Sequence, residues 1–305
     1  MSSRLVVLGW HNVTSTYCFP SGGDSGRRGL YEQLRLLKRV TTVVPLAEAL
    51  ADLAAGRPLP PRAVALTFDD GYRDNLTVAA PMLRLLDLPA TCFVVPGLLS
   101  RTTTPWWEVL AWGVECATAG ELKWNDAALP LQTAEQRRVA KQTVAEAVKR
   151  RDRVSRDEAV EEVVTQLAPL GPEPDEDMFL DWDSARELRE TMAIGSHSSS
   201  HAILSQETPE DQREDLVDAR RRIEAELECA APVLAYPNGG AADYDEATLA
   251  AVGAAGHTHA VTTRGGLNDR TTPPFEIRRT VMNPERGAVE VVKVLRDVAR
   301  SPVSR

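Results

Sequence analysis

The sequence lacks several features that mark common protein classes. It has four cysteines in 305 residues and no Cys-x-x-Cys pair, which excludes a zinc ribbon and a thioredoxin-type redox site. These cysteines are expected to be small buried hydrophobic residues in a reducing compartment. The net charge is −9, and no run of Lys or Arg is long enough to follow a phosphate backbone. We therefore expect no nucleic-acid partner.

Long hydrophobic runs are also missing. The N-terminus has a single Arg before only five apolar residues, 5–9, which are too few for a signal-peptide core or a membrane span. We therefore expect a cytoplasmic protein without a membrane span. A hydrophobic content of 43% is ordinary for a soluble globular protein, and 305 residues suffice for one large α/β barrel or two modest domains.

Apolar runs alternate with helical patterns along the chain. Continuous apolar runs are typical of strands buried on both faces of a parallel sheet or barrel. Such runs predict strands over 4–9, 41–44, 63–68, 90–95, 192–195, 232–236 and 258–262. Apolar residues at helical spacing predict helices over 74–86, 209–227 and 245–254. This alternation predicts a β/α architecture, in one domain that spans residues 1–305.

The segment 105–180 interrupts the alternation. It is mostly helical, strongly charged, and ends in the Pro-rich acidic stretch 171–177. We predict a helical insertion within the domain, with charge runs that form solvated helix faces. Its tryptophans are expected to anchor packing, with a role as ligand platforms as the alternative. They are Trp106, Trp107, Trp112 and Trp124.

Two adjacent carboxylates stand at the end of a predicted strand. Asp69 and Asp70 follow the run 63–68, and a barrel presents its catalytic side chains at such strand ends. Both can converge on one cavity in a strand-to-loop turn, where like charges coexist only if a cation neutralises them. Gly71 gives the chain the freedom to turn. The alternative is an ordinary turn that caps the helix beginning at Asp74.

Two histidines follow another predicted strand. His197 and His201 are four residues apart, a spacing that places both imidazoles on one face of a helical turn and lets them reach one divalent ion. No Glu follows the first His, which excludes a zincin protease. With one carboxylate, the pair forms a set typical of catalytic metal sites. The other carboxylate can then take a proton from the attacking water, which is the chemistry of metal-assisted amide hydrolysis.

Thr67–Tyr72 and Ser196–His201 resemble the first two motifs of the polysaccharide deacetylases, carbohydrate esterase family 4 or the NodB-homology domain. The resemblance covers most of the chain outside the insertion and implies a distorted (β/α) barrel. It also implies that Asp69 is the catalytic base. The family's metal is usually zinc, with cobalt or nickel in some members. The implied metal ligands are Asp70, His197 and His201.

The third family motif is only partly kept. Most members read Arg-x-Pro-Tyr/Phe-Gly, whereas residues 235–239 read Ala-Tyr-Pro-Asn-Gly, without the arginine that normally orients the catalytic Asp. This version is similar to the branch of the poly-N-acetylglucosamine deacetylases. We assign Tyr236 and Asn238 to substrate and oxyanion binding, Asn238 through its backbone N–H, with an ordinary turn as the alternative. Arg279 is the candidate to replace the missing guanidinium beside Asp69, with a surface salt bridge as the alternative.

The late Leu-x-x-x-His motif, which supplies the general acid in many members, is not recognisable. An amide leaving group departs as an amine and needs a proton, so another acid is required. His11 is the first candidate, because it ends the first predicted strand and would lie at the barrel mouth. His259 is the second candidate, although a buried core histidine is the simpler interpretation of its apolar surroundings.

The sequence therefore predicts a metal-dependent hydrolase of non-peptide carbon–nitrogen bonds, an N-deacetylase that releases acetate from an N-acetylated amino sugar or glycoside. Without an export signal, the expected substrate is a soluble amino sugar, a lipid- or nucleotide-linked sugar, or a biosynthetic glycoside. One alternative is an amidase or imidase of the same superfamily that acts on a non-carbohydrate amide. The other is an inactive carbohydrate-binding protein, against which the complete set of two Asp and two His residues argues.

Overall fold

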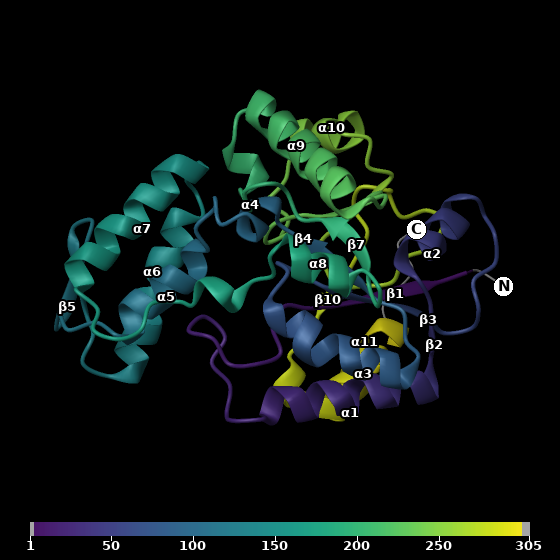
Figure 1. The fold of residues 1–305 in the computed structure, drawn as a ribbon, viewed down its shortest axis with the longest axis horizontal. Coiled ribbons are helices and arrows are strands. Elements are labelled where there is room, and N and C mark those ends of the chain that lie inside the picture. Colours follow the sequence, from purple (N-terminus) through teal and green to yellow (C-terminus); the bar gives the residue numbers. More distant parts are fainter. Residues whose placement is uncertain (1–2, 301–305) are drawn as a thin grey trace.

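The computed structural model describes residues 3–300, and a curled parallel sheet forms its centre (Figure 1). Within these residues the sheet has eight strands, in the order β10-β1-β3-β4-β7-β8-β9, with β2 paired on β3. The strands are β1 Leu5–Trp10, β2 Thr42–Val43, β3 Ala63–Phe68, β4 Thr91–Val94, β7 Ala193–Ser196, β8 Val233–Ala235, β9 His259–Val261 and β10 Thr280–Val281. Every predicted strand has its counterpart here, and the predicted (β/α) barrel architecture is confirmed. Strands β1, β3 and β4 are buried at each residue, which explains their continuous apolar sequences.

The segment 277–281 joins the two ends of the sheet. The Ile277 N–H donates to the Ala260 carbonyl at 2.9 Å, and β10 then pairs with β1. Arg279 lies between these two pairings with none of its surface exposed. Gly9 on β1 leaves room for the Arg279 side chain, because a Cβ on residue 9 would stand 3.1 Å from the Arg279 Cδ. Closure of the barrel thus carries a guanidinium into its interior.

Helices cover the outside of the sheet, with α9 and α10 at the top of the view and α1, α3 and α11 at the bottom (Figure 1). The predicted helices over 74–86, 209–227 and 245–254 are confirmed, the first of them beginning as a π-helical turn, η1. No helix within residues 3–300 has both the length and the apolar character needed to cross a membrane. The bounds are α1 Ser25–Val40, α2 Leu46–Ala54, η1 Asn75–Ala79, α3 Ala80–Leu86, α4 Pro96–Leu99, α8 Trp182–Leu188, η3 Leu204–Gln206, α9 Pro209–Leu227, α10 Glu246–Ala254, η4 Pro284–Arg286 and α11 Gly287–Arg300.

The segment 105–180 forms a lobe beside the barrel, at the left of Figure 1. It contains α5 Trp106–Glu115, the hairpin β5 Glu121–Trp124 and β6 Ala127–Pro130, α6 Ala134–Val148, α7 Arg153–Leu167 and η2 Glu176–Met178. Buried side chains of α5, α6 and α7 share one hydrophobic cluster, and the hairpin adds to the helices that the sequence predicts. Strand β1 runs from the labelled N-terminus toward this lobe, so the carboxyl ends of the parallel strands face it (Figure 1). The single domain over 1–305 stays a prediction, since residues 1–2 and 301–305 lie outside the described part.

A close helix contact provides a test of the packing around the barrel. Gly29 lies within α1, where an added Cβ would collide with the backbone carbonyl oxygen of Pro284. We expect Gly29→Ala to lower the free energy of unfolding by about 1–3 kcal/mol, because backbone atoms cannot move aside as side chains do. Alanine by itself favours a helix by about 1 kcal/mol, so a loss isolates the packing effect. Urea unfolding followed by circular dichroism measures it.

The matched control is Gly22→Ala, whose added Cβ would meet only the Ser25 Oγ, at 3.9 Å. Equal stability of the Gly29→Ala and Gly22→Ala variants would contradict the packing of α1 on η4.

Candidate active site

Asp69 and Asp70 leave the carboxyl end of β3 and turn into one pocket. Both are buried, and both line the same cavity of about 410 Å³. Asp70 and Gly71 have φ values of +68° and +73°, so the chain reverses at this point. A left-handed backbone is strained for a residue other than glycine, and such strain often occurs at functional sites. The turn thus presents two carboxylates side by side.

Asp70 meets both predicted histidines. Its Oδ1 lies 3.2 Å from the His197 Nε2 and 3.3 Å from the His201 Nε2. One ligand atom from each of the three residues falls within 4.8 Å of the others, and all three residues are buried. Around a tetrahedral ion with bonds of about 2.1 Å, ligand atoms stand about 3.4 Å apart. The spacing of these atoms therefore fits a divalent cation.

The hydrogen bonds of the triad also fit a cation. The His197 Nδ1 lies 2.7 Å from the Ala235 carbonyl oxygen, which can only accept, so the Nε2 keeps its lone pair free. Within the described chain, the buried Asp70 Oδ1 has no hydrogen-bond partner, a costly arrangement unless a cation binds there. Burial would raise the pKa of the Asp70 carboxyl, but without a bound cation protonated Nε2 atoms of His197 and His201 hold it well below the usual range. The carboxylate is therefore charged.

The segment 197–201 is a loop, so the predicted helical turn is wrong. Ser198 and His201 have φ values of +61° and +53°, which no α-helix of L-residues contains. The loop is held from outside by Asp215 on α9, whose Oδ1 accepts the Ser199 N–H at 2.7 Å. The two imidazoles converge because of this fastening and the backbone reversals, not because of helical periodicity.

Arg279 forms two parallel hydrogen bonds with Asp69. Its NH1 and NH2 groups donate to the Asp69 Oδ1 and Oδ2 at 2.5 Å and 2.7 Å. Both side chains are buried, so the alternative of a surface salt bridge is excluded. Burial would raise the pKa of the Asp69 carboxyl, but Arg279, with His197 nearby, outweighs it and lowers the pKa. Asp69 is therefore held as an oriented carboxylate.

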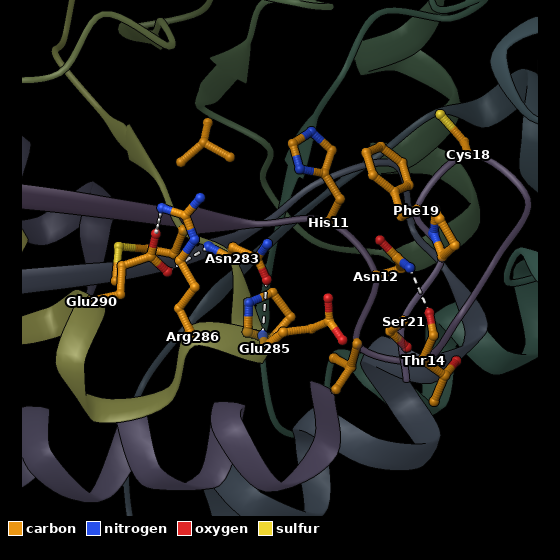
Figure 2. A pocket seen from close by; sticks show the side chains of 15 residues that line it. His11, Asn12, Thr14, Cys18, Phe19, Ser21, Asn283, Glu285, Arg286 and Glu290 are labelled. Atoms are coloured by element: carbon orange, nitrogen blue, oxygen red, sulfur yellow. Dashed lines mark hydrogen bonds and ion pairs between the residues drawn. The ribbon is translucent and has the colours of Figure 1, made fainter. Parts of the chain in front are cut away.

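His11 lies at the edge of this site. It follows β1, its Nε2 is 3.8 Å from the Asp69 Oδ2, and its side chain is 27% exposed. Its ring stacks on that of Phe19, with centroids 5.7 Å apart. Figure 2 shows the two rings side by side, above a second cavity formed with Glu285 and Arg286. His11 thus separates the two cavities and is open to solvent as well as to Asp69.

The structure adds a residue that positions the His11 loop. The Asp74 Oδ2 accepts the backbone N–H groups of Val13 and Thr14, both at 2.7 Å. The sequence pattern indicates only that a helix starts at Asp74, but the Asp74 carboxylate makes no capping hydrogen bond. No sequence pattern links residues 60 positions apart, so this contact could not be read from the motif.

The remaining predicted site residues divide between the pocket and the core. Asn238 lines the pocket with a φ of +59°, and its buried Nδ2 has no partner in the described chain. Tyr236 is not brought to the site, because its buried hydroxyl donates to the Phe275 carbonyl at 2.9 Å. His259 lies on β9 with its Nδ1 3.1 Å from the Thr258 Oγ1, and it does not line the pocket either.

The lobe supplies the wall opposite the carboxylates. The ring centroids of Trp107 and His201 are 4.3 Å apart, and the Trp107 Nε1 donates to the Tyr72 hydroxyl at 2.8 Å. Trp106 and Trp107 are buried and also line the cavity, so they pack in the lobe and face the cavity as well. Trp112 and Trp124 are buried and do not line it. No motif in the sequence points to the residues that α6 and its C-terminal end add to this wall, which are Arg138, Lys141, Gln142, Ala145 and Lys149.

Parts of the chain resemble known proteins in sequence. The family model described as polysaccharide deacetylase matches residues 56–260. The chain is 35% identical over 88 residues to the poly-beta-1,6-N-acetyl-D-glucosamine N-deacetylase of Escherichia coli (strain K12), a match that covers 28% of this chain and 13% of that protein. The predicted resemblance to this family is therefore confirmed.

Solved structures share the fold. The Streptococcus pyogenes deacetylase PplD in complex with acetate aligns with a TM-score of 0.64 and 17% identity, over 96% of this chain and 99% of that one. IcaB from Ammonifex degensii aligns with a TM-score of 0.61 and 17% identity, over 96% and 98%. These likenesses confirm the predicted NodB-type barrel.

The buried ion pair yields a stability prediction. Arg279→Met leaves the Asp69 carboxylate buried without a partner, so we expect the free energy of unfolding at pH 7 to fall by about 3–5 kcal/mol. Adding Asp69→Asn should recover most of this loss, because the double variant buries no unpaired charge. Urea unfolding in the presence of a chelator measures both variants without a contribution from metal.

Arg57→Met is the control, because Arg57 pairs with Asp52 at 2.7 Å but is 58% exposed. The exposed pair should contribute less than about 1 kcal/mol. Equal losses for Arg279→Met and Arg57→Met would contradict the buried pair.

Proposed function

The chain belongs to the polysaccharide deacetylase family, and from that premise we propose that it is a metal-dependent N-deacetylase. It hydrolyses the acetamide of an N-acetylated amino sugar or glycoside and releases acetate. One observation carries this proposal: an Asp69 carboxylate fixed by Arg279 stands in the same pocket as the metal-ligand set of Asp70, His197 and His201.

Asp70, His197 and His201 would hold one divalent ion. Two imidazoles and a carboxylate suit zinc best, with cobalt or nickel as alternatives. When bound, the ion supplies Lewis acidity, which polarises the acetamide carbonyl and makes water a stronger acid. The Ala235 carbonyl orients the His197 ring for this role.

Asp69 is the proposed base. The Arg279 fork occupies one lone pair on each carboxylate oxygen, and the second lone pair of either oxygen can accept a proton from the attacking water. Because Arg279 lowers its pKa, the carboxylate is charged at neutral pH and need not lose a proton first. The fork also fixes the direction in which the base points.

His11 is the proposed acid. Its ring lies at the mouth of the pocket near Asp69, where it can donate a proton to the nitrogen as the C–N bond breaks. Asn238 is assigned a hydrogen bond to the oxygen on which negative charge develops, and its unpartnered Nδ2 in the pocket supports this role beside the backbone N–H. Tyr236 has no part in this scheme, because its hydroxyl is already bonded in the core.

A sugar substrate is supported by the aromatic lining. Phe19, Trp106 and Trp107 all face the cavity, and aromatic rings present flat apolar surfaces with polar edges of the kind that bind a sugar face. The Escherichia coli relative is named as a poly-N-acetylglucosamine deacetylase, which supports an N-acetylhexosamine unit. We therefore favour a sugar amide over the non-carbohydrate amide of the imidase alternative.

Metal removal and Asp69→Asn separate the two halves of the mechanism. We expect a chelator to abolish acetate release from N-acetylglucosamine oligomers and added zinc to restore it. Asp69→Asn should keep its metal, because Asp69 is not a ligand, but should lower kcat by about 10²–10⁴-fold. Metal analysis and an acetate-release assay on the same samples measure both effects.

Asp126→Asn, in the exposed turn of the lobe hairpin, is the control and should retain both metal and activity. Activity that survives chelation, or a wild-type protein that neither binds metal nor turns over, would sink the proposal.

A further inference from the structure

We propose that the substrate carries a phosphate group and that Lys141 of α6 and Lys149, the residue that follows α6, bind it. The inference rests on the proposed function, because it names the class of substrate that the same pocket accepts. It assigns to the lobe a role in substrate selection.

One face of α6 is turned toward the active site. Its pocket-lining residues are Arg138, Lys141, Gln142 and Ala145, and Lys149, which follows the last helical residue, extends the same row. Their spacing of three, four, seven and eleven residues from the first keeps them on one side of a helix. The opposite side is buried in the core of the lobe through Ala140, Val144 and Val148. The lobe core therefore fixes the orientation of the polar face toward the pocket.

The carboxylates that line the pocket cannot neutralise this face. They are Asp69 and Asp70, of which Asp69 is already paired with Arg279 and Asp70 is assigned to the metal ion. A protein with a net charge of −9 thus has a pocket wall with excess positive charge. Such a wall attracts an anionic ligand and repels a cationic one.

The cations on this wall are not equally available. Arg138 already forms two hydrogen bonds with Glu135, at 2.6 Å and 2.8 Å. Lys141 lies 4.0 Å from Glu115, which is too long for a hydrogen bond. Lys149 has no ionic partner in the described part of the chain. The charge that remains for a ligand is therefore that of the two lysines.

Both lysines act on the interior of the pocket. Cys18 lines the cavity, and burial, with Glu108 nearby, raises the pKa of its thiol to about 12. Lys141 and Lys149 both oppose this rise. Both lysines also line this one cavity, so a ligand bound there can meet both.

These donors favour a phosphate over a carboxylate. A carboxylate is bound best by two parallel hydrogen bonds from an arginine, but the Arg138 guanidinium already donates two such bonds to Glu135. Phosphate offers three acceptor oxygens, which two lysine ammonium groups on flexible stems can approach separately. The cavity beyond His11 suits a phosphate less well, because its charged lining residues are Glu285, Glu290 and Arg286, and Arg286 forms an ion pair with Glu290 (Figure 2).

The test compares zinc-loaded protein on two substrates, N-acetylglucosamine 1-phosphate and the neutral methyl glycoside of N-acetylglucosamine. We expect the wild type to prefer the phosphorylated sugar in kcat/KM. Lys141→Gln/Lys149→Gln should reduce that preference by about tenfold, mainly through KM, and should weaken its dependence on salt. Lys123→Gln, exposed on β5 of the same lobe and outside the pocket, should keep the preference. A preference found only with a nucleoside-diphosphate N-acetylglucosamine also supports the inference and assigns the group to a diphosphate ester.

A wild type that prefers the neutral glycoside over both phosphorylated sugars, or a double variant with the wild-type preference, overturns the inference and leaves the deacetylase function standing. If no substrate releases acetate, the proposed function fails, and calorimetric binding of N-acetylglucosamine 1-phosphate decides the phosphate question separately. Weaker binding by the double variant than by Lys123→Gln supports the site, and equal binding overturns it.

Discussion

The buried pair of hydrogen bonds between Arg279 and Asp69 is the interaction on which the rest of the site depends. It joins the segment that closes the barrel to the carboxyl end of β3, and it is made possible by the missing side chain at Gly9. An unpaired charge at this depth would cost several kcal/mol. The segment that closes the barrel therefore also supplies the guanidinium that orients the proposed base.

Much of the fold could be predicted, because strands buried on both faces need continuous apolar sequence, and β1, β3 and β4 have it. Two-residue β10 has no such pattern, and its place depends on pairing with β1 at the other end of the chain. The spacing of His197 and His201 suggested a helix, but their convergence comes from left-handed backbone at Ser198 and His201, which the side-chain pattern does not reveal.

The site likewise combines residues that the sequence reveals with residues that only the structure reveals. Asp69, Asp70 and the two histidines could be selected from local motifs, and the resemblance to a family pointed to Arg279. Tyr236 adjoins the right loop, but the pleat turns its side chain into the core. Asp215, Lys141 and Lys149 lie far along the chain from the strand-end motifs, and no sequence pattern links them to the site. The charge on the lobe side of the pocket is therefore visible only in the structure.

The central claim is a division of labour, in which Asp70, His197 and His201 hold the metal while Arg279 reserves Asp69 for proton transfer. Anomalous X-ray diffraction at the zinc absorption edge, from crystals grown with zinc, tests it most directly. The account predicts one peak within about 2.0–2.2 Å of the three ligand atoms, with Asp69 still bonded to Arg279. A peak coordinated by Asp69, or an Arg279 side chain turned away from it, would contradict the account.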